Sequence, residues 1–238
     1  PAIWNIRTGE RHDFDMSELA GEVIPVDWHA PSGRILAVHV ADGIHHLLEI
    51  RESDGSVRTV LEGGSFADPD VADVHPFQWA SYYSPEGAIR AVRSSWDVPL
   101  HIVEVAADGR TSTLLEPAAV PAGHPLESVM VESADGTRVQ LWWARPSGRE
   151  PRGTVLEIHG GPMLVTVDAY DPSAQAWLDA GFAYASLNYR GSVTFGRAFR
   201  EGFWGVGGDR EIEDVAAAIA WLREQGLARP ESTFITGA

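Results

Sequence analysis

The stretch with the clearest chemical potential is "EIHGGP", residues 157–162, which follows a short apolar run typical of a buried strand. Its two consecutive glycines let the backbone approach a ligand closely. Amide N–H groups in such a loop can stabilise the negative charge that develops on an oxygen during acyl transfer. The loop is therefore a candidate oxyanion hole, and the alternative is a tight strand-to-loop turn that binds no ligand.

Acyl transfer by a serine also needs an activated nucleophile, a base, and an acid that orients the base. The nucleophile motif G-x-S-x-G occurs nowhere in the 238 residues, and the only histidine after residue 126 is His159. The final residues, "STFITGA", read as a strand that arrives at this motif, with Gly237 and Ala238 as its first two positions. We therefore expect a fragment that ends just before the nucleophile, lacks the catalytic triad, and is inactive when taken alone.

The elements around the loop alternate between strand and helix. A hairpin is predicted from 129–131 and 139–143, followed by a strand in "GTVLEIHGG", a short helix in "DPSAQAWLDAG" and a strand in "FAYASLNY". A longer helix follows, with apolar residues spaced by three or four positions at Ile212, Val215, Ile219 and Leu222. Strands that alternate with helices indicate a parallel sheet with crossover helices, so residues 126–238 are predicted to be α/β.

The first half of the chain has a different pattern, with short alternating runs that end at Asp-Gly or similar pairs, as antiparallel hairpins do. A unit made of a tryptophan, a tight turn and a strand occurs twice, at Trp28, 31–33 and 35–38 and at Trp79, 85–87 and 89–92. A repeat of about forty to fifty residues with four short strands per unit is typical of propeller blades. Residues 1–120 are thus predicted to be a partial β-propeller, its last two blades plus one outer strand, with a β-sandwich as the alternative.

Prolines at positions 117, 121 and 125 interrupt both strand and helix, so we expect the boundary between the halves near residues 117–127.

The net charge is −16, and all 18 basic residues are arginines without a cluster, so no nucleic acid partner is expected. No apolar run is long enough to span a membrane, and no membrane partner is expected. The absence of cysteine is compatible with a reducing compartment, and we expect a cytoplasmic protein.

Two further motifs complete a family signature: "NYRGSVTFGRAF" at 188–199 and "GGDREIEDV" at 207–215. Together with the HGGP loop and the blade-like repeats, they resemble the prolyl oligopeptidase family of serine peptidases. The acylaminoacyl-peptidase and dipeptidyl-aminopeptidase-like branch is the most similar. The resemblance implies C-terminal blades of a β-propeller, followed by the N-terminal half of an α/β-hydrolase catalytic domain.

The same resemblance implies roles for four residues. The backbone N–H of Gly161 matches the family's oxyanion donor, and the second donor belongs to the residue after the nucleophile. His159 and Gly160 match the supporting loop and are predicted to contact the substrate. Arg190 matches an arginine beside the active-site cleft. Two alternatives stay open. His159 is also interpreted as a loop histidine bonded to backbone, in preference to a catalytic base, and Arg190 is equally compatible with a structural ion pair.

Three acidic residues near the start of the last helix, Asp209, Glu213 and Asp214, superficially resemble a metal site. Carboxylates at a helix N-terminus are favoured by the helix dipole and as caps, so we predict this role for them. No metal and no cofactor are expected.

The resemblance implies a serine peptidase that cleaves short peptides or acyl and aminoacyl amides through an acyl-enzyme, with the propeller gating access. Its partners would be that substrate and the remaining polypeptide of the same protein. Two alternatives are a small-molecule amide or ester hydrolase of the same fold, and a non-catalytic binding protein.

Overall fold

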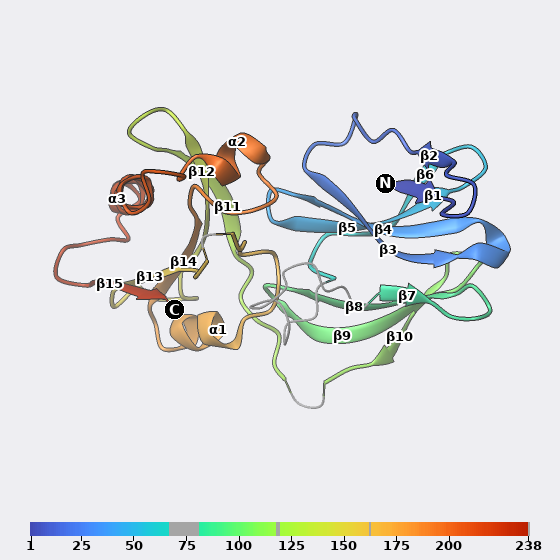
Figure 1. Ribbon diagram of the computed structural model, residues 1–238. Helices are drawn as coiled ribbons and strands as arrows, with labels where there is room; N and C mark the ends of the chain where they lie inside the picture. Colours follow the sequence, from blue (N-terminus) through green and yellow to red (C-terminus); the bar gives the residue numbers. More distant parts are fainter. Residues whose placement is uncertain (67–80, 118–119, 162, 238) are drawn as a thin grey trace. The chain divides into compact units, whose positions relative to one another are not determined.

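The computed structural model describes residues 1–66, 81–117, 120–161 and 163–237 (Figure 1). The chain forms two compact units. Unit 1 comprises Pro1–Ser94 with Leu100–Ala119, and unit 2 comprises Ser95–Pro99 with Val120–Ala238. We describe each unit by itself.

Unit 1 consists of antiparallel sheets whose strands follow one another in chain order (Figure 1). The first four-stranded sheet contains β3 (Glu22–His29), β4 (Arg34–Ala41), β5 (Ile44–Arg51) and β6 (Val57–Glu62). The second contains β7 (Ser81–Tyr83), β8 (Ile89–Ser95), β9 (Val98–Val105) and β10 (Thr111–Leu115). A separate pair is formed by β1 (Ala2–Trp4) and β2 (Arg11–Asp13). The predicted antiparallel hairpins are confirmed, while the repeat position Trp79 lies outside the described residues.

One hydrophobic cluster joins the two four-stranded sheets. Leu36 and Val38 of β4 and Leu47 of β5 pack in the same cluster as Ile89 of β8 and Val103 of β9. Alternate residues of a strand point to opposite faces, so Leu36 and Val38 lie on one face of β4. The two sheets of unit 1 therefore bury one face each in a shared core.

A buried carboxylate reinforces this packing. Glu49 of β5 accepts hydrogen bonds from Arg34 at 3.1 Å, Arg58 at 2.8 Å and the Tyr83 hydroxyl at 3.0 Å. Burial and the neighbouring Glu49 carboxylate raise the pKa of Tyr83, so its hydroxyl keeps the proton that it donates. The two sheets are thus linked by a polar contact as well as by apolar packing.

Unit 2 is built on a mixed five-stranded sheet of order β11-β12-β14-β13-β15. Its elements are β11 (Glu127–Glu132), β12 (Arg138–Ala144), β13 (Thr154–Ile158), α1 (Pro172–Asp179), β14 (Ala183–Asn188), α2 (Arg197–Glu201), α3 (Asp209–Glu224) and β15 (Thr233–Gly237). β11 and β12 form the predicted hairpin, and β13 pairs in parallel with both β14 and β15. The parallel core with crossover helices is confirmed. The short helix α2 was not predicted.

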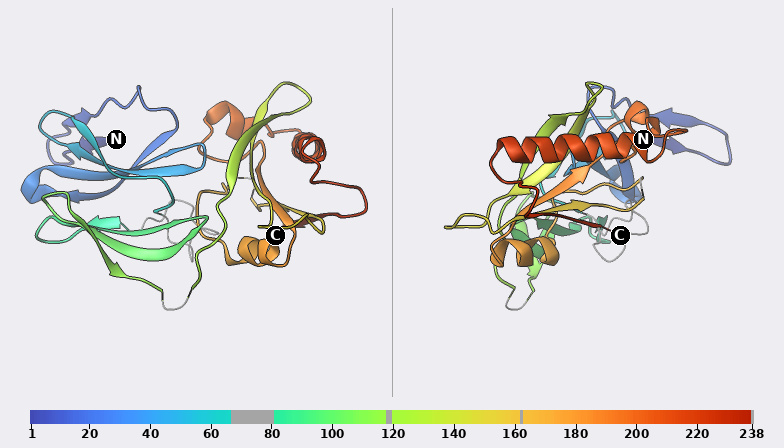
Figure 2. Two further views of the ribbon diagram at one scale, coloured as in Figure 1. Left: turned by 180° about the vertical axis from the view of Figure 1, so that it is seen from behind. Right: turned by 90° about the vertical axis from the view of Figure 1, so that its left-hand side faces the viewer.

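The two crossovers place their helices on opposite faces of the sheet. The chain passes from β13 through α1 to β14, then returns past β13 through α3 to β15. Crossover connections are right-handed, so reversing the direction along the sheet moves the helix to the other face. Figure 2 shows α1 and α3 on the two sides of the strands. The core under α3 is formed by buried side chains that include Leu141, Leu156, Leu187, Ala218 and Leu222.

The inner face of α3 differs from the predicted one at one position. Ile212 was predicted to face the core, but its side chain is 68% exposed. Asp214, Ala218 and Leu222 form the buried row instead, while Val215 and Ile219 pack at its edge. The reason is an ion pair of Asp214 that draws this carboxylate inward, so that the helix turns Ile212 to solvent.

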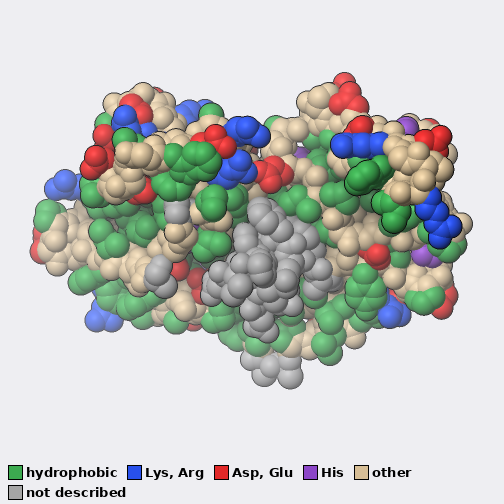
Figure 3. Space-filling model, in the orientation of Figure 1, with side chains coloured by type: hydrophobic (Ala, Val, Ile, Leu, Met, Phe, Trp, Pro, Cys, Tyr) green, Lys and Arg blue, Asp and Glu red, His purple; other side chains and the backbone are tan. Residues whose placement is uncertain are grey.

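Two surface properties follow from the described residues. No helix among them is both long and apolar enough to cross a membrane. On the face drawn in Figure 3, Arg side chains are dispersed among Asp and Glu rather than gathered into one patch.

Candidate functional site

The topology of unit 2 forms a switch point at one defined edge of the sheet. β13 and β14 are adjacent and parallel, and the chain leaves them toward helices on opposite faces. The loops that follow the two strands therefore diverge, and in open α/β sheets this switch point is where ligands bind. His159, Gly160 and Gly161 leave from β13, and Tyr189 to Ser192 leave from β14.

His159 connects the two loops. Its ring stacks on the ring of Tyr189, with centroids 4.6 Å apart and an angle of 23° between the planes. Its Nε2 lies 2.9 Å from Ser192 Oγ, and its Nδ1 lies 2.8 Å from the carbonyl oxygen of Gly160. Burial lowers the pKa of His159, so the ring is neutral at neutral pH. These contacts match a loop histidine bonded to backbone, whereas a substrate contact of His159 stays a prediction.

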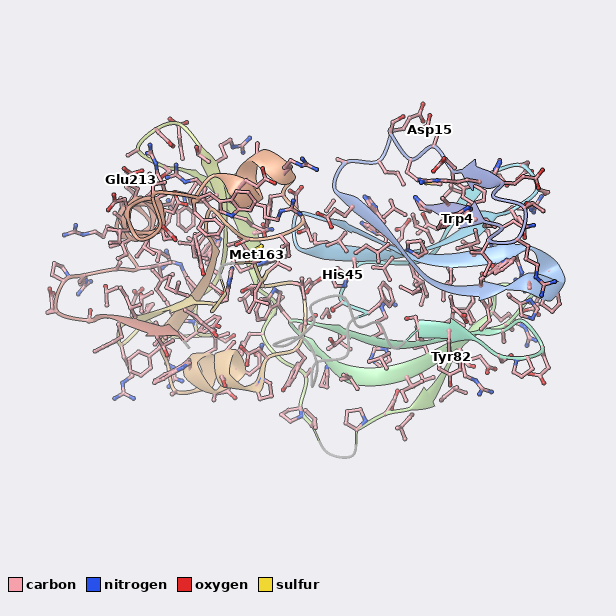
Figure 4. All side chains as sticks on the ribbon, in the orientation of Figure 1. Trp4, Asp15, His45, Tyr82, Met163 and Glu213 are labelled. Atoms are coloured by element: carbon pink, nitrogen blue, oxygen red, sulfur yellow. The ribbon has the colours of Figure 1, made fainter. Side chains whose placement is uncertain are left out.

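Gly161 occupies a conformation that requires glycine. Its φ is +121°, and a Cβ built there would lie 2.8 Å from the backbone nitrogen of Met163. Figure 4 labels Met163, two residues further along this exposed loop. Among the residues that the structure describes, no acceptor faces the Gly161 N–H. An exposed, unpaired amide at the switch point has the properties that an oxyanion donor needs.

Arg190 is held in a buried ion-pair cluster, and its side chain is only 5% exposed. Its Nη2 lies 2.6 Å from Asp214, and the guanidinium also pairs with Glu213 and Asp135 and donates to Ser133. Hydrogen bonding to Asp214 raises the pKa of Arg190. Figure 4 shows Glu213 on α3. The geometry favours the structural ion pair over the cleft role, and a substrate contact of Arg190 stays a prediction.

Asp214 is the residue that sequence reasoning misread. It was predicted to interact with the helix dipole or to cap the helix, but its carboxylate is fully buried and accepts from both the backbone and the side chain of Arg190. The capping interaction of α3 comes from Glu211, which accepts from the Gly208 N–H at 2.8 Å. The sequence contained one indication that Asp214 is buried. It stands four positions before Ala218 and eight before Leu222, and both of these lie on the inner face of the helix.

The loop after β14 contains a strained residue. Thr194 is buried and has a φ of 75°, a region that β-branched residues rarely adopt. Within the described part of the chain its hydroxyl has no hydrogen-bond partner. The neighbouring Val193 N–H donates to the Leu164 carbonyl at 3.0 Å, which fixes this loop against the one after β13. Backbone strain of this kind costs about 1–3 kcal/mol and tends to occur at functional sites.

Side chains of a serine, a histidine and an aspartate are in contact elsewhere in unit 2. Ser147 Oγ is 3.2 Å from His124 Nδ1, and His124 Nε2 is 3.0 Å from Asp179. The Asp179 side chain is 71% exposed, so water competes with the histidine for its carboxylate. We therefore assign this cluster to surface contacts that tie His124 to α1.

Comparison with known proteins relates this chain to one family. Residues 169–238 match the family model described as "Prolyl oligopeptidase family". This part of the chain is similar to the prolyl oligopeptidase family. Acylamino-acid-releasing enzyme 2 of Oryza sativa is 27% identical over 113 residues, which cover 48% of this chain and 13% of the relative. Dipeptidyl aminopeptidase BIII of Pseudoxanthomonas mexicana is 31% identical over 87 residues, which cover 37% of this chain and 13% of the relative.

Solved structures share the fold of nearly the whole chain. A puromycin-hydrolyzing peptidase of Mycobacterium tuberculosis matches with a TM-score of 0.75 at 21% identity, covering 97% of this chain and 36% of that one. An acylaminoacyl peptidase in complex with Z-Gly-Gly-Phe-chloromethyl ketone matches with a TM-score of 0.76 at 17% identity, covering 96% and 35%. The chain thus spans about a third of the length of these structures.

Proposed function

We propose that this chain is part of a serine peptidase that cleaves short peptides, or acyl and aminoacyl amides, through an acyl-enzyme. The observation that carries the proposal is the N–H of Gly161 at the switch point of the sheet, which faces no acceptor among the described residues. Its relatives include an acylamino-acid-releasing enzyme and a dipeptidyl aminopeptidase, which supports amide rather than ester substrates. Stabilising the oxyanion of the tetrahedral intermediate is the role that Gly161 would have.

The nucleophile would be a serine on the turn that follows β15. In α/β-hydrolases this serine sits on a sharp turn after a strand, and the N–H of the residue after it is the second oxyanion donor. Gly237 at the end of β15 is in register with Ile158, the residue before His159. A turn that follows β15 would therefore start beside the His159–Gly161 loop, as attack on a carbonyl bound to Gly161 would require.

Unit 1 would contribute propeller blades that limit access to the site. Its two four-stranded sheets are simple meanders that share a core, which supports the blade interpretation over a sandwich with Greek-key connections. The gating role and the cytoplasmic localisation are parts of the proposal.

The experiment is a hydrolysis assay of the full-length protein on matched aminoacyl-arylamides and aryl esters, before and after replacement of the expected serine by alanine. The proposal predicts amide turnover that the alanine variant loses. Turnover of esters alone would indicate a small-molecule esterase. No turnover in a folded protein would indicate a non-catalytic binding protein.

A further inference from the structure

We infer that His159 is a positioning residue whose ring sets the direction of the Gly161 N–H. The inference rests on the proposed function, in which this N–H binds the oxyanion. The carbonyl of Gly160 and the N–H of Gly161 belong to the same peptide unit. Because that unit is planar and trans, the two groups point in opposite directions. A ring that holds the Gly160 carbonyl therefore also fixes where the Gly161 N–H points.

The contact between His159 and Gly160 determines which ring nitrogen carries the proton. A carbonyl oxygen only accepts, so Nδ1, 2.8 Å away, must be the donor. In the neutral ring Nε2 is then an acceptor, and the Ser192 hydroxyl at 2.9 Å is its donor. That hydroxyl also lies 2.7 Å from the Tyr189 carbonyl, so its single proton has two acceptors. The Gly160 bond is therefore the more specific of the two ring contacts.

The His159 ring is held in place by contacts that reach back to the core of unit 2. Tyr189 stacks on it and donates its hydroxyl to the His159 carbonyl at 2.9 Å. The next residue, Arg190, is fixed by Asp214 through its backbone N–H at 2.8 Å and its guanidinium. A chain of direct contacts thus runs from Asp214 on α3 to the Gly160 carbonyl.

Such support matters because glycines on both sides of a peptide bond allow it to rotate at low cost. Without the ring, the Gly160–Gly161 peptide would sample orientations in which the N–H faces away from the oxyanion. The substrate would still bind, because the ground-state complex depends little on this donor. The loss would fall on the chemical step.

Two variants of the full-length protein separate the ring contacts. In His159→Asn the side-chain amide nitrogen takes the place of Nδ1 and retains the donor to Gly160. In His159→Gln the amide group takes the place of Nε2 and retains only the Ser192 contact. His159→Ala removes both. The melting temperature of each variant shows whether it is folded before its kinetics are compared.

We expect His159→Ala and His159→Gln to lower kcat by about ten- to hundredfold with little change in KM, because loss of a whole oxyanion donor costs about 10²- to 10³-fold. His159→Asn should recover most of that loss. Crystal structures of the same proteins should show the Gly160–Gly161 peptide as described here in wild type and His159→Asn, and reoriented in His159→Ala.

The inference is overturned if His159→Ala keeps the peptide orientation, or if the Asn and Gln variants lose kcat equally. A rise in KM without a change in kcat would assign His159 to substrate binding instead. If the wild type turns over no substrate, the proposed function fails, while the peptide orientation in the variant structures still decides the role of His159.

Discussion

Gly237 of β15 pairs with Ile158 of β13 so closely that a Cβ on Gly237 would lie 2.4 Å from the Ile158 carbonyl oxygen. Only glycine permits this approach without displacing one of the strands. Because Ile158 immediately precedes His159, the contact fixes the end of β15 against the start of the Gly161 loop. The carboxyl ends of β13 and β15 are therefore held together by backbone packing.

Replacing Gly237 with alanine should separate the carboxyl ends of β13 and β15. We expect Gly237→Ala to destabilise the full-length protein by about 1–3 kcal/mol, as overpacking does, and to lower kcat. Thermal unfolding and hydrolysis kinetics measure the two effects. Gly207→Ala is the control, because a Cβ there has no neighbour within 4 Å. Equal losses in the two variants would contradict the role of the close approach.

Asp214→Asn should be among the most destabilising single changes in unit 2. It leaves the buried Arg190 guanidinium without its principal partner, and breaking a buried pair in this way costs about 3–5 kcal/mol. Arg210→Gln is the matched control, since the partly exposed pairs of Arg210 contribute about 1 kcal/mol or less. Denaturant unfolding measures both. A raised KM with unchanged stability would support the substrate role of Arg190 instead.

The strands and the two crossover helices of unit 2 could be predicted because burial and periodicity are local properties of the sequence. The fully buried run of β14 and the repeating apolar positions of α3 are examples. The exposed position of Ile212 could not be predicted, since it depends on Asp214 meeting Arg190, 24 residues away. A carboxylate near a helix start is normally a dipole partner, and only the tertiary pairing makes this one a core residue.

The candidate site also has features that the sequence predicts and features that it does not. The order of elements already places the loops after β13 and β14 at a switch point, so the meeting of His159 with the NYRGS motif follows from topology. The bond from the His159 ring to the carbonyl of the next residue has no sequence pattern, because it depends on side-chain rotamers. The strain at Thr194 is likewise invisible in the sequence, where threonine gives no sign of a positive φ.

In unit 1, Glu49→Gln should destabilise the first four-stranded sheet and weaken the Tyr83 contact that links it to the second. The neutral amide loses the charge that pairs with Arg34 and Arg58, and hydrogen bonds to charged groups contribute about 1.5–3 kcal/mol. Thermal unfolding of the full-length protein should show a lower transition for unit 1. Glu86→Gln on the exposed turn before β8 serves as the control, and a shift as large in that variant would contradict the prediction.

Stability should depend on pH through Asp135. Hydrogen bonds from Thr137 first, and from Arg190 next, lower the pKa of Asp135 from 3.8 to about 2. A carboxylate whose pKa is lower in the folded state stabilises the fold above its unfolded pKa, and the contribution is lost as the pH falls. The stability difference between wild type and Asp135→Asn should therefore shrink from pH 3.8 to about 2. Unfolding curves across this range measure it, and a constant difference would contradict the assignment.

The most direct test of the account is a crystal structure of the full-length protein after reaction with a peptide phosphonate, which mimics the tetrahedral intermediate on the nucleophile. The account predicts phosphorus bonded to a serine on the turn after β15, with a phosphonyl oxygen about 2.7–3.1 Å from the Gly161 nitrogen. A phosphonate attached at another place, or one whose oxygens point away from the Gly161 N–H, would contradict it.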